Sequence, residues 1–128
     1  QGGVLMHGPT FMANPLATAV AGRSIELLLA SPWQQRIAAM EQQLQRELGA
    51  YASHPAVADV RVLGGIGVVE ARQPVDVAAL QKLFVEQGVW IRPFGRLIYL
   101  MPPYVIEPAD LRVLTRAVGA ALAATRAP

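Results

Sequence analysis

The chain has 128 residues, a length that suits one domain with a single hydrophobic core. Its net charge is only +2, and its arginines and carboxylates are interspersed, so no basic cluster indicates a nucleic-acid partner. The lack of cysteine excludes disulfides and thiolate metal sites, and no apolar run reaches the roughly 18 residues of a membrane-spanning helix. Because 53% of the residues are hydrophobic, we expect a dense core or apolar surface that meets a partner.

Residues 1–13 are rich in glycine and show no periodic pattern, which predicts a loop or linker. The first residues contain neither an initiator methionine nor a signal-peptide pattern, so we expect a cut inside a longer chain of cytoplasmic origin. Asn14 and Pro15 then form a helix start signal. The segment 16–30 should be a helix that is apolar on most sides and therefore well buried.

Ser31 and Pro32 repeat the start signal, and an amphipathic helix is predicted over about 33–51. Its expected core face comprises Trp33, Ile37, Met40, Leu44 and Leu48. Alternating residues predict strands at 57–63 and 66–71, joined by a turn at Gly64 and Gly65. A third helix is expected at about 77–87, with Gly88 at its C-terminal end.

Two further strands, 89–92 and 97–101, are predicted to form a hairpin around residues 93–96. A last helix begins at Glu107 and Pro108. These elements predict an α+β fold, a small and mainly antiparallel sheet with helices packed on one face. The domain should span residues 14–128, preceded by the linker.

Three positions could bind anions. The segment containing Gly8, Pro9 and Thr10 precedes a helix and could bind a phosphate, although it could also be a plain loop with a capping threonine. Arg92 lies at a mostly apolar strand end, where a guanidinium pairs well with a carboxylate, but it could equally extend into solvent. Tyr99, across the predicted hairpin, could bring its hydroxyl near Arg92 or be an ordinary strand residue.

Other residue patterns give no site. Lys82 is the only lysine, and it lies within an amphipathic helix, where a solvated position is expected. His7 and His54 have no third ligand at metal spacing, so no metal site is assigned. The glycines at 64–67 join two strands and lack the spacing of a dinucleotide-binding loop. No catalytic residue is assigned.

Four segments resemble a known family. Residues 6–17 (MHGPTFMANPLA) resemble the segment of class III aminotransferases that crosses from the large to the small domain. Residues 89–95 (VWIRPFG), 97–104 (LIYLMPPY) and 57–70 resemble more specifically the members of this family that act in biotin biosynthesis. The resemblance covers essentially the whole chain and implies the C-terminal domain of a fold-type I enzyme that depends on pyridoxal 5'-phosphate.

The resemblance also implies roles for single residues. Pro9 and Thr10 would bind the cofactor phosphate in the other subunit of a homodimer, and Gly8 would line the substrate pocket. Arg92 would hold the carboxylate of 7-keto-8-aminopelargonate, which receives an amino group from S-adenosylmethionine, and Tyr99 would line the same pocket. The imine-forming lysine of the family belongs to the large domain and has no match here, so the chain alone is expected to be inactive.

Three alternatives remain. The chain could be the small domain of another class III aminotransferase, a stand-alone module that binds a carboxylate, or a structural dimerisation domain. The glycine-rich start favours an enzyme fragment.

Overall fold

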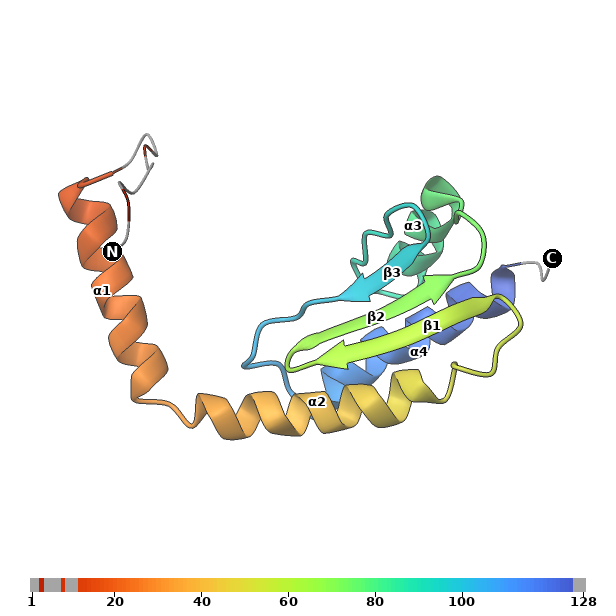
Figure 1. Ribbon diagram of the computed structural model, residues 1–128, viewed down its shortest axis with the longest axis horizontal. Coiled ribbons are helices and arrows are strands. Elements are labelled where there is room, and N and C mark those ends of the chain that lie inside the picture. Colours follow the sequence, from red (N-terminus) through yellow and green to blue (C-terminus); the bar gives the residue numbers. More distant parts are fainter. Residues whose placement is uncertain (1–2, 4–7, 9–11, 126–128) are drawn as a thin grey trace. The chain divides into compact units, whose positions relative to one another are not determined.

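A computed structural model describes residues 3, 8 and 12–125 (Figure 1). The chain divides into two compact units, Gln1–Trp33 and Gln34–Pro128, which we consider separately. The described residues form four helices and three strands, and none of these helices is long and apolar enough to cross a membrane. The predicted linker at 1–13 lies largely outside the described residues and stays a prediction.

The first unit contains helix α1 (Pro15–Leu29). It begins as predicted, because the Asn14 side chain accepts a hydrogen bond of 3.0 Å from the Ala17 N–H. The expectation that this helix is well buried is wrong for the chain: none of its residues is buried, and Leu16 and Leu29 are 75% and 70% exposed. An apolar composition indicates that a helix favours burial, but it does not supply the surface that covers it.

The second unit contains the sheet, with strands in the order β1 (Val57–Leu63), β2 (Ile66–Ala71) and β3 (Leu97–Leu100), each antiparallel to its neighbour. Both predicted strands of the first hairpin are confirmed. Val60 pairs with Val69, which in turn pairs with Ile98, and these side chains point to the inner face of the sheet.

Three helices cover the inner face, namely α2 (Trp33–Gly49), α3 (Val77–Glu86) and α4 (Pro108–Ala124). Figure 1 shows α3 and α4 behind the sheet, whose other face is free of helices. Both Leu44 and Leu48 of α2 are fully buried beside Gly67, where a side-chain carbon would lie 2.6 Å from Leu48 Cδ1. The lack of a side chain at Gly67 therefore lets α2 approach the sheet closely. The predicted α+β class, with helices on one face, is confirmed.

The predicted strand at 89–92 is wrong. This segment has no regular secondary structure and joins no ladder, and an isolated bridge between Phe94 and Leu97 forms at the turn that follows (Figure 1). Pro93 has no N–H to donate, which removes a ladder hydrogen bond from this segment. Val89 and Ile91 are nevertheless buried in the core. The apolar pattern therefore indicated buried residues correctly, but it did not indicate a paired strand.

Polar contacts join α2 to α4. The Glu47 carboxylate accepts hydrogen bonds from Gln43 Nε2 at 3.0 Å and from Thr115 Oγ1 at 2.5 Å. The Tyr51 hydroxyl, just beyond α2, donates to the Thr115 carbonyl oxygen at 3.2 Å. The pKa of Tyr51 is raised mainly by its burial. The negative charge of Glu47 has a smaller effect in the same direction.

Candidate functional site

Arg92 and Tyr99 line the same hollow in the second unit. The hollow has a volume of about 230 Å³, and its other walls are Trp90, Ile91, Leu100, Met101, Pro102 and Leu114. The structure therefore brings together the two residues that the sequence singled out for one pocket. The hollow is smaller than the roughly 300–1,000 Å³ of a typical ligand pocket, so it suits one end of a molecule.

The Arg92 side chain is exposed, and it makes no hydrogen bond or ion pair with any other described residue. Its guanidinium thus has all five donors available beside largely apolar walls. Such walls lower the local dielectric, which strengthens a charge-assisted hydrogen bond to an anion. A carboxylate matches the forked geometry of the guanidinium. The hollow can therefore bind a carboxylate at the end of an apolar chain.

The backbone around Arg92 is held on both sides. On the N-terminal side, Gly88 ends α3 with a φ of +75°, and the Val89 N–H donates to the Phe84 carbonyl oxygen at 2.9 Å. On the C-terminal side, Phe94 and Leu97 exchange two backbone hydrogen bonds of 2.9 and 2.8 Å. Arg92 therefore sits between two ordered turns, although it belongs to no strand.

Tyr99 reaches the hollow from β3. It pairs with Val68 of β2, and its partly exposed side chain lies on the helix-free outer face of the sheet. The expected route, in which paired hairpin strands bring the tyrosine to Arg92, is wrong because residues 90–92 form no strand. The two side chains instead meet as walls of one hollow.

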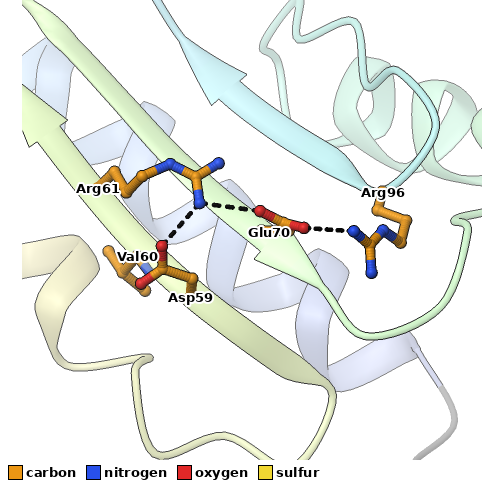
Figure 2. Close-up of polar contacts among 5 residues, drawn as sticks. All are labelled: Asp59, Val60, Arg61, Glu70 and Arg96. Carbon is orange, nitrogen blue, oxygen red and sulfur yellow. Dashed lines mark hydrogen bonds and ion pairs between the residues drawn. The ribbon is translucent and has the colours of Figure 1, made fainter.

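Sequence reasoning missed a chain of four alternating charges on the outer face, which we call the ion-pair chain: Asp59, Arg61, Glu70 and Arg96. Figure 2 shows Glu70 between the two arginines. Its carboxylate oxygens lie 2.8 Å from Arg61 Nη1 and 2.7 Å from Arg96 Nη2. Arg61 Nη1 also lies 2.6 Å from Asp59 Oδ2. Strand alternation places Asp59 and Arg61 on one face, but the sequence does not indicate which residues lie beside them.

Charge and hydrogen bonding within the ion-pair chain shift two pKa values. The hydrogen bond from Arg61, together with one from the Val60 N–H, lowers the pKa of the Asp59 carboxyl. Hydrogen bonds to Glu70 and Asp59 raise the pKa of Arg61. Both shifts favour the charged forms that the ion-pair chain requires.

The other predicted site residues lie elsewhere. Gly8 is exposed, with no heavy atom within 4 Å of an added side-chain carbon, whereas Pro9 and Thr10 lie outside the described residues. The Lys82 side chain is 80% exposed, and its Nζ atom lies 4.0 Å from Glu86, so the predicted solvated position is confirmed.

Comparison with known proteins places the chain in a family. The model of the class III aminotransferases matches residues 1–122, and the chain belongs to this family. Several relatives carry the name adenosylmethionine-8-amino-7-oxononanoate aminotransferase. The one from Buchnera aphidicola subsp. Acyrthosiphon pisum is 50% identical over 120 residues, which are 94% of this chain and 28% of the relative. The one from Corynebacterium glutamicum is 48% identical over 121 residues, 94% of this chain and 29% of the relative.

The solved structures agree on the fold. A thermostable (S)-enantioselective omega-transaminase from Thermomicrobium roseum superimposes with a TM-score of 0.82 at 30% identity, over 97% of this chain and 30% of that one. The chain therefore spans less than a third of the length of these relatives.

Proposed function

We propose that this chain is the C-terminal part of a pyridoxal-phosphate-dependent aminotransferase of biotin biosynthesis. The whole enzyme moves an amino group from S-adenosylmethionine to 7-keto-8-aminopelargonate and yields 7,8-diaminopelargonate. The names and identities of the relatives support this reaction. One structural observation supports the role of this part: Arg92 borders a hollow with largely apolar walls, and its guanidinium has no partner among the described residues. The keto acid has a carboxylate at the end of an aliphatic chain, which matches both features.

In this proposal the chain binds substrate, and the chemistry belongs to the rest of the enzyme. When bound, pyridoxal phosphate supplies the electron sink of the reaction. Among the described residues the imine-forming role does not fit the one lysine, because Lys82 is 80% exposed on a helix, whereas such a lysine needs a desolvated position. Arg92 orients the carboxylate end of the keto acid, and Tyr99 forms part of the wall beside it.

We assign further roles to residues 8–10, in a homodimer of the whole enzyme. Pro9 and Thr10 contact the cofactor phosphate across the interface of a homodimer, and Gly8 lines the substrate pocket. The family membership of residues 1–122 supports these roles. The protein works in the cytoplasm on small-molecule substrates.

The test is the affinity of the full-length enzyme for the keto acid. Arg92→Ala should weaken binding at least about 30-fold, since a desolvated charged contact contributes about 2 kcal/mol or more. The matched control is Arg46→Ala, which removes an exposed arginine of α2 and should leave the affinity unchanged. The methyl ester of the keto acid should bind both variants alike. An unchanged affinity of Arg92→Ala for the free acid would remove Arg92 from the site.

The donor and the isolated chain need separate measurements. In the full-length enzyme S-adenosylmethionine should support turnover, whereas a diamine donor such as putrescine should not. The opposite result would favour another class III aminotransferase. One relative of that kind is a putrescine–pyruvate aminotransferase, which is 29% identical over 125 residues. The isolated chain should show no turnover with pyridoxal phosphate. A borohydride-trapped adduct at Lys82 would contradict the proposal that the imine-forming lysine belongs to the rest of the enzyme.

A further inference from the structure

The ion-pair chain ends at the turn that follows Arg92. Glu70 lies on the central strand, where it pairs with Asp59 on one side and Leu97 on the other. Its side chain is only 18% exposed, whereas the side chains of Arg61 and Arg96 are about half exposed. Both carboxylate oxygens are used, one for each arginine (Figure 2). Glu70 is thus the least exposed member of the ion-pair chain, and Arg96 connects it to the turn.

The backbone of this turn is bound to the end of β2 and to the residues just beyond it. The Arg96 carbonyl oxygen accepts a hydrogen bond of 2.7 Å from the Ala71 N–H, and the Gly95 carbonyl oxygen accepts one of 2.9 Å from the Val75 N–H. Gly95 has a φ of +58°, a conformation that favours glycine. The turn therefore has backbone anchors, and the Glu70–Arg96 ion pair adds a side-chain anchor three residues after Pro93, whose ring restricts the backbone beside Arg92.

Glu70 also lies on the sheet face that carries Tyr99, one wall of the hollow. It is on the same sheet face as Val68, whose strand partner is Tyr99, so Glu70 and Tyr99 are diagonal neighbours. An unneutralised carboxylate there would repel an anionic ligand and could capture Arg92 itself. Because Arg61 and Arg96 bind both of its oxygens, Glu70 leaves Arg92 without a protein partner among the described residues.

We propose that Glu70 is a positioning residue of the carboxylate site: through Arg96 it holds the turn that sets the place of Arg92. This inference rests on the proposed role of Arg92. It predicts that breaking the Glu70–Arg96 pair from either side weakens binding of the carboxylate. Net charge alone predicts something different. Glu70→Gln removes a negative charge near the site and should tighten anion binding, whereas Arg96→Gln should weaken it.

The experiment measures the affinity of the full-length holoenzyme for the keto acid and for its methyl ester. Glu70→Gln and Arg96→Gln should each weaken acid binding about tenfold, the order expected for neighbours coupled in one network, and should leave ester binding unchanged. Arg96→Lys keeps the charge and should restore most of the affinity. The matched control is Glu86→Gln, which breaks an exposed pair on α3 and should change neither affinity.

A double-mutant cycle separates positioning from general structural damage. In the Arg92→Ala background, Glu70→Gln should have no further effect on acid binding, because it acts through Arg92. If Glu70→Gln fails to fold, Arg96→Gln in the Arg92→Ala background carries the test, because net charge predicts a further loss of acid binding there and positioning predicts none. Unchanged or tighter acid binding by Glu70→Gln, or equal losses for acid and ester, overturns the inference. If Arg92→Ala itself leaves acid binding unchanged, the proposed function fails instead.

Discussion

Replacing Gly67 with alanine tests how closely α2 packs against the sheet. The new methyl would lie 2.6 Å from Leu48 Cδ1 and 3.3 Å from Leu44 Cδ2, and both leucines are fully buried. Carbon atoms pack best at about 3.5–4.0 Å, so the Leu48 methyl must move by roughly 1 Å within a filled core. Such overpacking costs about 1–3 kcal/mol, and the lower flexibility of the unfolded chain returns about 0.4–1 kcal/mol. We expect a net loss of about 1–2 kcal/mol.

Urea and thermal unfolding of the chain, followed by far-ultraviolet circular dichroism, measure this loss. For a unit of this size the midpoint temperature should fall by about 5–15 °C. Gly49→Ala is the matched control, because no atom lies within 4 Å of its added carbon, and it should be neutral or slightly stabilising. In a Leu48→Ala background, which creates the missing space, Gly67→Ala should cost less or become favourable. A Gly67→Ala chain as stable as the wild type would refute the packing argument.

Three further predictions concern stability of the chain. The raised pKa of Tyr51 means that its contribution is present below pH 10, about the pKa of an unfolded tyrosine, and is lost as pH rises through the folded value; Tyr51→Phe should remove this alkaline dependence of the urea midpoint. The lowered pKa of Asp59 means that its contribution is present above about pH 3.9 and is lost as pH falls through the folded value, so Asp59→Asn should flatten the acid side of the same profile. Deletion of residues 1–32 should leave the stability of the second unit within about 0.5 kcal/mol, since no α1 residue is buried and the core begins at Met40; a chain that fails to refold would contradict this.

Local signals predicted most of the secondary structure. Asn14 and Asp76 each precede a predicted helix, and each side chain accepts a hydrogen bond of 3.0 Å from the N–H three residues later. Strands β1 and β2 have the predicted bounds, because alternation and a glycine turn are properties of a short segment. Predicted helix ends differ by one or two residues, the usual uncertainty of frayed termini.

Features that depend on distant parts of the chain could not be predicted. The apolar residues 89–91 proved to be core without being strand, because pairing needs a neighbour with free hydrogen-bonding groups, and Pro93 interrupts the ladder. The contact between Glu70 and Arg96 joins residues 26 positions apart, and no local pattern indicates it. The exposure of α1 could not be predicted either, because whether an apolar helix is buried depends on other surfaces that its own sequence does not specify.

The pairing of the arginines beside the outer face of the sheet supports the case for an external anion at Arg92. Arg61 and Arg96 emerge on the outer face of the sheet, and the fold gives each of them an oxygen of the same carboxylate. Arg92 borders the same face through the hollow it shares with Tyr99, yet no carboxylate of the described residues pairs with it. An arginine that only stabilised the fold would benefit from such a partner. Arg92 lies between two ordered turns and beside apolar walls, so its backbone is already ordered before a ligand binds, and binding loses less conformational entropy there.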